Sequence, residues 1–572
     1  MNRFSLSRAD LLACLSEFSL TLLVFFVCAA DPPPSVNEAH YLAKAKHYWD
    51  PSWCAKDFFI TSSQTHATFY FFFGWPTLFV DLETVAWAGR FAGWSMLAAG
   101  LIRLCSVLHL RSWTPLVAWL WVAGVSQGNL AGEWVVGGIE AKVPAYGLVL
   151  WGMADAIRGR FGAAWMAMGA AAAFHVLTGG WAVVATMLMA LATTWKEAGW
   201  RARLAPFATG GLWIGGLLSL PGLLPALALN QGVTPEESVS AAKIYTYFRL
   251  GHHLLPSSLQ AWWYLRFAIM TAVTLWLWTK IARFTLLAGG SSEARGGRKP
   301  PPTDPPEHPI DSAFSIPPDR LRRWRTLLLS SLIITSIGLA LGILPAFNPD
   351  LAAQVLRFYW FRLADAWIPL GMATGIAVMV RQLCESRKLS ENGITTVRGI
   401  AIATGLLITV SYAQDVIART TRGVPRAVDN RVLGLHRDAD YWTQQRVMED
   451  WMAVCRFIRA STPRDAVLLT PRHQQSFKWY AARAEVVNWK DVPQDARALR
   501  EWARRFLEIY PVRLDTMRVT IRYDDLREFR RKYGVDWIIV DKRITGEHLP
   551  LVRVYPFDRE TNKTYAVYRL PN

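Results

Sequence analysis

The stretch Asn37-Glu38-Ala39-His40-Tyr41-Leu42 is the part of the sequence around which the rest can be placed. It follows the first hydrophobic run, Leu11–Ala30, and the break Asp31-Pro32-Pro33-Pro34. The run is long enough to cross a membrane, and consecutive prolines cannot continue a helix. We therefore expect Glu38 to lie at the water edge of a membrane, on the side to which a first span delivers the chain.

The composition is typical of a helical membrane protein with many spans. The chain has 572 residues, of which 52% are hydrophobic and 28 are Trp. Aromatic side chains concentrate at membrane interfaces. The basic amino-terminus, Met1–Arg8, resembles that of a signal peptide, but the long run and the prolines after it favour a retained first span.

About eleven runs have the length and apolar character of a membrane span. They are Leu11–Ala30, Thr84–His109, Trp113–Ser126, Val143–Ile157, Gly162–Leu177, Gly180–Thr194, Leu204–Leu227, Trp262–Leu286, Trp324–Phe347, Ala364–Val380 and Val397–Ile417.

The charges of the connecting loops predict the orientation. With the amino-terminus inside, every inner loop longer than two residues carries Lys or Arg, as cytoplasmic loops do. The outer segments are then 31–83, 127–142, 178–179, 228–261, 348–363 and everything after about residue 418. This predicts a multi-pass protein of the cell (inner) membrane, with a cytoplasmic amino-terminus and an extracytoplasmic carboxyl-terminal domain.

Four parts are expected along the chain. Residues 1–286 hold eight spans and the large first outer loop, and 324–417 hold three more. Between them, 287–323 is a proline-rich cytoplasmic linker, a tether or else a partner-binding segment. Residues 418–572 alternate helical and strand patterns and predict a small α/β domain. Its helices are Tyr441–Ala460, Ala496–Ile509 and Tyr523–Tyr533, and its strands Ala466–Leu469, Val535–Val540, Leu549–Tyr555 and Tyr565–Leu570.

A net charge of +18 raises the question of nucleic-acid binding. Basic cytoplasmic loops and their attraction to anionic headgroups explain the same charge. We therefore expect membrane lipids as partners and no nucleic acid.

Two early outer loops carry carboxylates. Glu38 is either a catalytic base or an acidic residue that stabilises the first turn of the predicted helix from Glu38 to Trp49. The glycine-rich loop 127–142 brings Glu133 and Glu140, and its glycines allow a close approach of the backbone to a ligand. The alternative for Glu140 is an interfacial ion pair with Lys142.

Two later outer loops carry cations. Arg249, His252 and His253 suit a phosphate, since adjacent histidines do not share the helix face that a zinc pair needs. Arg357 and Arg362 flank an aromatic run and suit an anionic headgroup. The alternative for both clusters is an aromatic-basic anchor at the membrane interface.

Together these residues fit transfer from a lipid-linked phosphate. A carboxylate takes the proton of an acceptor hydroxyl, and Arg, Lys or His stabilises charge on the leaving phosphate. Any prediction of a metal site rests on the carboxylates alone, because the scattered cysteines form no CxxC pair.

The architecture resembles the GT-C type of membrane glycosyltransferases, which use polyprenyl-phosphate-linked sugars. The family's first-loop carboxylate matches Glu38 in Asn37–Tyr41, and its second acidic residue best matches Glu140 in Gly138–Lys142. The segment from Trp451 to Lys490 is similar to the start of such a family's outer domain. The sequence departs from the pattern at Asn37, where many members have Asp, and lacks the Trp-Trp-Asp signature of oligosaccharyltransferases. The Tyr-rich element ending His252-His253-Leu254-Leu255-Pro256 also resembles an uncharacterised multi-pass bacterial family.

The resemblance implies an inverting glycosyltransferase that acts on a polyprenyl-phosphate sugar at the outer face. Glu38 is the expected base, and Glu140 is expected to support it or to help bind a divalent metal ion. Arg249, His252, His253, Arg357 and Arg362 are expected around the donor phosphate. The alternative is a transporter or flippase for a lipid-linked or anionic solute, which would place ionisable groups within the spans. A third reading is a non-catalytic assembly scaffold.

Overall fold

The computed structural model describes residues 8–126, 129–195, 199–293, 316–385, 391–510, 523–546, 549–558 and 561–571. Each of the eleven predicted spans falls on a helix, which confirms the polytopic helical fold. Within the described residues, seven helices are long and apolar enough to cross a membrane, and two shorter apolar helices accompany them. The core of the predicted linker, 294–315, lies outside the described residues.

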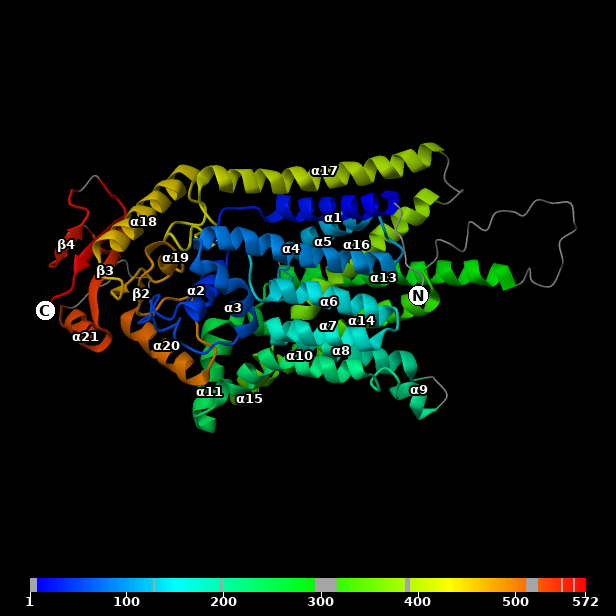
Figure 1. Cartoon of the computed structure of the whole chain (residues 1–572), viewed down its shortest axis with the longest axis horizontal. Coiled ribbons are helices and arrows are strands. Elements are labelled where there is room, and N and C mark those ends of the chain that lie inside the picture. Colours follow the sequence, from blue (N-terminus) through cyan, green and yellow to red (C-terminus); the bar gives the residue numbers. More distant parts are fainter. Residues whose placement is uncertain are drawn as a thin grey trace, which may run out of the picture.

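The helices that match the predicted spans form the body of the molecule (Figure 1). They are α1 (Arg8–Ala29), α4 (Leu82–Val107), α5 (Thr114–Ser126), α6 (Lys142–Ile157), α7 (Phe161–Phe174), α8 (Val176–Thr194), α10 (Gly210–Leu227), α13 (Ala261–Glu293), α14 (Pro318–Leu341), α16 (Arg362–Glu385) and α17 (Glu391–Arg422).

Small residues let two of these helices pack with their backbones in contact. A Cβ atom on Gly169 of α7 would collide with the backbone of Gly215 in α10, and one on Gly211 would collide with Gly162. Apolar helices gain little from hydrophobic burial inside a lipid bilayer, so close van der Waals packing of this kind holds them together. These contacts fix α10 against α7.

Short helices gather at one end of the bundle, where the C-terminal domain sits, whereas α9 (Trp200–Leu204) lies at the other end (Figure 1). They are α2 (Glu38–Trp49), α3 (Ala67–Gly74), α11 (Pro235–Lys243), α12 (Gly251–Leu254) and α15 (Pro349–Leu356), with the short turns η1 (Trp75–Leu78), η2 (Ala228–Asn230), η3 (Ile244–Arg249), η4 (Pro256–Ser258) and η5 (Leu344–Ala346). All of them belong to the predicted outer segments except η5, which lies at the end of the predicted span Trp324–Phe347. The segments predicted to share one side of the membrane thus lie together.

The C-terminal region is a small α/β unit. Its sheet has the order β2-β1-β3-β5-β4, with β1 parallel to β2 and β3, and β5 antiparallel to β3 and β4. The strands are β1 (Val467–Leu469), β2 (Ala484–Glu485), β3 (Val535–Asp541), β4 (Val552–Tyr555) and β5 (Tyr565–Arg569), and the helices are α18 (Tyr441–Ser461), α19 (Phe477–Ala481), α20 (Ala496–Ile509), α21 (Tyr523–Tyr533) and α22 (Lys542–Thr545).

Alternating side chains cover the two faces of this sheet, as the two-residue period of a strand requires. Ile538 and Val540 of β3 pack with Leu499 and Phe506 of α20. Ile539, between them, packs on the opposite face with helix α18. The predicted helices and strands of this region are confirmed, while α19, β2 and α22 were not predicted.

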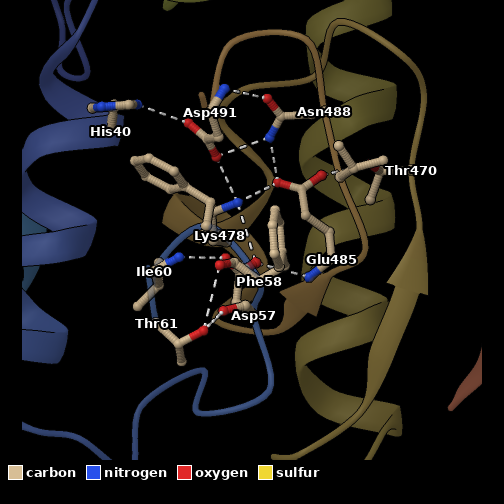
Figure 2. A network of polar contacts seen from close by, with 12 residues as sticks. His40, Asp57, Phe58, Ile60, Thr61, Thr470, Lys478, Glu485, Asn488 and Asp491 are labelled. Carbon is tan, nitrogen blue, oxygen red and sulfur yellow. Dashed lines mark hydrogen bonds and ion pairs between the residues drawn. The ribbon is translucent and has the colours of Figure 1, made fainter. Parts of the chain in front are cut away.

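A buried cluster of charges ties the first outer loop to this C-terminal unit (Figure 2). The Lys478 ammonium of α19 lies 3.3 Å from Asp57 of the first outer loop, 2.5 Å from Glu485 and 2.6 Å from Asp491. Asp57 also accepts the backbone N–H of Glu485 at 3.0 Å. Four enclosed charges from two distant parts of the chain are thus held at one point.

Three carboxylates surround the one ammonium of this cluster. Burial alone would lower the pKa of Lys478, but the three carboxylates raise it well above its usual value. The ammonium therefore stays charged across the physiological pH range. Asn488 donates to Glu485 at 2.7 Å and to Asp491 at 2.9 Å, which satisfies further lone pairs. We call Asp57, Lys478, Glu485 and Asp491 the interdomain charge cluster.

Removing Lys478 should separate the two parts. Lys478→Met leaves three buried carboxylates without their cation, and breaking a buried pair in this way costs about 3–5 kcal/mol. We expect a loss of that size in the free energy of unfolding of the full chain in detergent micelles. Limited proteolysis should also release the C-terminal unit sooner than in the wild type.

A matched control joins the same two parts on the surface. Lys56 pairs with Asp465 at 2.7 Å, with side chains 58% and 67% exposed. Lys56→Met should cost less than about 1 kcal/mol, as exposed pairs do. Equal losses for the two variants would contradict a special role for the buried cluster.

Candidate functional site

A cavity of about 520 Å³ lies where the helix bundle meets the C-terminal unit. Its wall combines α2, the loop before α6, the start of α8, the end of α10, η3 and the loop before α16 with the segment between β2 and α20. Cavities of a few hundred cubic ångströms hold small molecules. No single domain makes this cavity, so a ligand in it would contact both halves of the chain.

Helix α2 presents one face to the cavity. Asn37, His40 and Tyr41 all line it, and they follow the spacing of three and four residues that places side chains on one side of a helix. The Asn37 amide donates to Glu140 at 2.6 Å. The Tyr41 hydroxyl lies 3.3 Å from Nε2 of His66. This face therefore reaches both the second outer loop and the rest of the first.

A chain of paired charges forms a second wall. Lys142, the first residue of α6, lies 3.1 Å from Glu140 and 3.0 Å from Glu133. Glu133 is also 3.2 Å from the Arg362 guanidinium at the start of α16. All four side chains are buried and all four line the cavity. They bring together Glu140 and Arg362, two residues that the sequence singled out, through Lys142 and Glu133.

Three further cations line the cavity without an ion pair to another described residue. Arg249, Arg357 and Lys490 form no ion pair with any carboxylate in the described part of the chain. Arg249 is 7% exposed, donates to the backbone oxygen of Trp489 at 2.9 Å and lies over the Trp489 ring at 5.0 Å. Together with Lys142 and Arg362, five Lys and Arg side chains face two glutamates in the described lining, so the cavity carries an excess of positive charge.

The pKa values of the lining side chains decide which of them are charged at neutral pH. Burial lowers the pKa of Arg249 to about 10, so this guanidinium stays charged at neutral pH. Burial, and then the Arg249 charge, lowers the pKa of Lys490 to about 8. Burial lowers the pKa of His253 to about 3 and that of His252 to about 4. The positive charge therefore comes from Arg and Lys, not from the two histidines.

Most, but not all, of the predicted phosphate-binding residues line the cavity. Arg249, His253, Arg357 and Arg362 line the cavity, as does Glu140. His253 holds the second outer loop through Nδ1, which lies 2.5 Å from the backbone oxygen of Ala131. The His252 ring lies against the His253 ring, with centroids 4.1 Å apart and a tilt of 44° between them, and His252 does not line the cavity.

Glu38 does not line the cavity. Its carboxylate is enclosed, takes the Arg90 guanidinium at 2.8 and 2.6 Å, and accepts the backbone N–H groups of Ser35 and Ile139 at 2.7 and 2.9 Å. With these four hydrogen bonds it has no room for an acceptor hydroxyl. The prediction that Glu38 is the base is thus corrected: Glu38 ties the first loop, α4 and the second loop together.

Several lining residues were not predicted as site residues. They include His40, Tyr41, His175, Tyr245, Tyr359 and Lys490. Lys490 lies in a loop that reaches the cavity only because the interdomain charge cluster holds its neighbour Asp491. His175 is bound by Arg362 at 2.9 Å, a contact between α7 and α16 that no local pattern indicates. The sequence marks these residues only weakly as site residues. Each is a single polar or aromatic residue in a predicted outer segment or near the outer end of a span.

The cavity offers few side chains that could bind a metal ion. Within the described ranges, no group of three or more His, Cys, Asp or Glu side chains is placed to hold a metal ion. The two lining carboxylates are held by Lys142 and Arg362 instead. The binding of a divalent metal ion stays a prediction.

The model of a domain of unknown function, DUF6798, matches residues 449–509, a segment that contains Lys478, Lys490 and Asp491. No curated protein matches the sequence. The crystal structure of apo ArnT from Cupriavidus metallidurans is 14% identical with a TM-score of 0.45, and the match covers 98% of both chains. The Archaeoglobus fulgidus oligosaccharyltransferase, tethered with an acceptor peptide, is 10% identical with a TM-score of 0.41, covering 92% of this chain and 69% of that chain. At these scores neither likeness defines a site or a reaction.

The place of Glu38 predicts a structural phenotype. Glu38→Gln leaves Arg90 buried without a counter-charge, which costs about 3–5 kcal/mol. We expect this loss in the free energy of unfolding of the full chain in detergent micelles, and a similar loss for Arg90→Met. The control is Glu83→Gln, an exposed change on α4 that should cost less than about 0.5 kcal/mol. A Glu38→Gln chain as stable as the wild type would contradict this role.

Proposed function

We propose that the chain is an inverting glycosyltransferase that moves a sugar from a polyprenyl-phosphate-linked donor to an acceptor at the outer face of the membrane. The observation that carries the proposal is the group of three unpaired cations, Arg249, Arg357 and Lys490, in a cavity bordered by apolar membrane helices. Arg249 is buried, and Arg357 and Lys490 are partly exposed in the cavity wall. A charge withdrawn from water is normally paired, because an isolated charge is costly to desolvate. A phosphate is the counter-charge that these cations lack.

An apolar wall beside the cations suits the lipid part of the donor. Val176 and Leu177 of α8, Ala226 of α10 and Leu229 of η2 line the same cavity. Both α8 and α10 have the length and hydropathy of membrane spans, and α10 exposes large apolar side chains such as Trp213 and Leu217. An isoprenoid chain could therefore lie along α10 in the bilayer while its phosphate reaches the cavity.

The cations have a chemical task in this reaction. When the bond between the sugar and the phosphate breaks, the phosphate gains a negative charge. Preorganised guanidinium and ammonium groups stabilise that charge more in the leaving group than in the intact donor, which lowers the barrier. Arg249 and Arg357 supply positive charge at any physiological pH, and Lys490 supplies positive charge below a pH of about 8.

Glu140 keeps a supporting role. It receives Asn37 at 2.6 Å and Lys142 at 3.1 Å, so both of its oxygens have partners. Its negative charge favours the positive charge that develops on the sugar ring as the glycosidic bond breaks. Asn37 and Lys142 fix the carboxylate in place, which a preorganised site requires.

The charges inside the spans favour the enzyme over the transporter. Arg90 pairs with Glu38, and Arg103 pairs with Asp155 at 2.6 Å. Asp365 accepts the backbone N–H groups of Leu130 and Ala131 at 3.0 and 2.8 Å. These groups hold helices and loops together, whereas a solute path would need them available to a ligand.

Charge removal tests the phosphate site. Citronellyl phosphate, a short water-soluble isoprenoid phosphate, should bind the full chain in nanodiscs, as measured by calorimetry. Arg249→Gln, Arg357→Gln and Lys490→Gln should each weaken this binding by about tenfold or more, since one charge-assisted hydrogen bond contributes about 1.5–3 kcal/mol. Arg464→Gln, an exposed change of the same charge in the C-terminal unit, is the control. Equal affinities for all four variants would contradict the proposal.

The same binding should depend on pH through Lys490. The lowered pKa of about 8 means that Lys490 is charged below that pH and neutral above it. Affinity for citronellyl phosphate should therefore fall as the pH rises through about 8, and this fall should be absent in Lys490→Gln. A fall of the same size in both proteins would assign the titration to another group.

Enzymatic activity is the decisive readout. Citronellyl-phosphate hexoses and pentoses, offered with a lysate lipid fraction as acceptor, should release citronellyl phosphate in the presence of the wild type. Glu140→Gln should lower the rate more than the affinity for citronellyl phosphate. Failure of the wild type on every donor of this set would overturn the proposed reaction.

A further inference from the structure

The proposed reaction needs a proton acceptor, and the correction of Glu38 leaves that place open. Glu140 has both oxygens occupied, and Glu133 lies between two cations, Lys142 and Arg362. The remaining basic side chains of the described lining that are neutral at neutral pH are four histidines: His40, His66, His175 and His253.

Three of these histidines are committed elsewhere. His66 has Nδ1 3.3 Å from the backbone oxygen of Phe174 and Nε2 3.3 Å from the Tyr41 hydroxyl. His175 has Nδ1 3.2 Å from the backbone nitrogen of Thr178 and Nε2 2.9 Å from the Arg362 guanidinium. His253 is bound to the backbone oxygen of Ala131 and contacts no carboxylate of the described residues.

His40 is arranged differently. Its Nδ1 lies 3.1 Å from Asp491, across 451 positions of sequence (Figure 2). Its side chain is 18% exposed, whereas Asp491 is 2% exposed. One ring face packs near Phe59, with centroids 4.3 Å apart. A histidine on the cavity wall is thus backed by an enclosed carboxylate.

The state of Asp491 fixes the tautomer of His40. Burial raises the pKa of Asp491, but Lys478 and the hydrogen bond with His40 bring it below its ordinary value, so the group is an anion. An ionised carboxylate only accepts hydrogen bonds, and therefore Nδ1 of His40 must carry the proton that it shares with Asp491. In a neutral ring Nε2 is then the unprotonated, basic nitrogen.

We propose that His40 is the general base of the glycosyl transfer and that Asp491, from the C-terminal unit, is the positioning residue that orients it. This inference rests on the proposed function. It also gives the C-terminal unit a part in the chemistry, because Asp491 belongs to that unit. The interdomain charge cluster holds Asp491 in place.

The acceptor hydroxyl gives its proton to Nε2 of His40 while its oxygen forms a bond to the anomeric carbon of the sugar. The bond from that carbon to the donor phosphate oxygen breaks, and its electron pair stays on the phosphate, whose charge changes from −1 to −2. The imidazolium is stabilised by the Asp491 carboxylate, and the phosphate by Arg249, Arg357 and Lys490.

The charges that face His40 determine its titration. They are Lys44 on its own helix, and Asp491 and Lys490 from the C-terminal unit. Burial lowers the pKa of His40, and the hydrogen bond and charge of Asp491 raise it, with a net value below the ordinary one. His40 is therefore neutral, and able to accept a proton, at neutral pH.

The first experiment measures turnover and binding separately. With citronellyl-phosphate sugars and the full chain in nanodiscs, His40→Gln should lower the release of citronellyl phosphate by about 10²–10⁴-fold, as the loss of a general base does. Its affinity for citronellyl phosphate should stay within about threefold of the wild type. His66→Gln, another lining histidine of the first outer loop, is the matched control and should keep more than a tenth of the rate. A His40→Gln chain with the wild-type rate would overturn the proposal.

Chemical rescue and pH dependence separate catalysis from structure. Added imidazole should restore part of the rate of His40→Ala, which a purely structural histidine would not allow. The wild-type rate should fall as the pH drops through the pKa of His40. Asp491→Asn removes the group that raises this pKa, so the fall should move to lower pH and the maximal rate should decrease. An unchanged profile in Asp491→Asn, or a rate of His40→Ala that imidazole does not alter, would count against the dyad.

The tautomer is measurable without any turnover. Nitrogen-15 NMR of histidine-labelled full chain should show His40 with its proton on Nδ1, assigned by its absence in His40→Gln. This signal should change in Asp491→Asn. A proton on Nε2 in the wild type would overturn the dyad, whereas an inactive wild type with the expected tautomer would overturn the proposed reaction alone.

Discussion

The ion cluster around Lys478 is the interaction on which the arrangement of the site depends. A single buried ammonium is within 3.3 Å of carboxylates from the first outer loop and from two places in the C-terminal unit. Charges this deeply enclosed are stable only in good geometry with all partners present. The cluster therefore fixes the C-terminal unit against α2, and with it the positions of Lys490 and Asp491 at the cavity.

Paired and unpaired charges have different tasks in this molecule. Glu38 with Arg90, and Arg103 with Asp155, are closed pairs that hold loops and spans together. Lys142 and Arg362 belong to a chain with Glu133 and Glu140 that builds a wall of the cavity. Arg249, Arg357 and Lys490 have no ion pair within the described residues, as is also true of the buried Lys44 and Arg483, but these three meet in one place beside apolar helices. This contrast is the basis on which we propose an anionic, lipid-linked ligand for this cavity and none for Glu38.

Much of the fold could be predicted because its signals are local. The helices α2, α20 and α21 begin and end where the periodicity and end residues indicate, and the apolar runs fall on helices. The two-residue strand β2 could not be predicted, since its conformation depends on pairing with β1. Glu38 was placed correctly at the start of a helix, yet its role depends on Arg90, a partner 52 positions later. The His40–Asp491 contact is still more distant in sequence, and only the tertiary structure brings it together.

The central claim is that a lipid phosphate binds between the helix bundle and the C-terminal unit. A cryo-electron microscopy structure of the full chain in nanodiscs with a polyprenyl phosphate tests it most directly. The account predicts the phosphate within hydrogen-bonding distance of Arg249, Arg357 and Lys490, with the isoprenoid chain along α8 and α10. A phosphate bound away from these three residues, or on the opposite side of the membrane from the C-terminal unit, would contradict it.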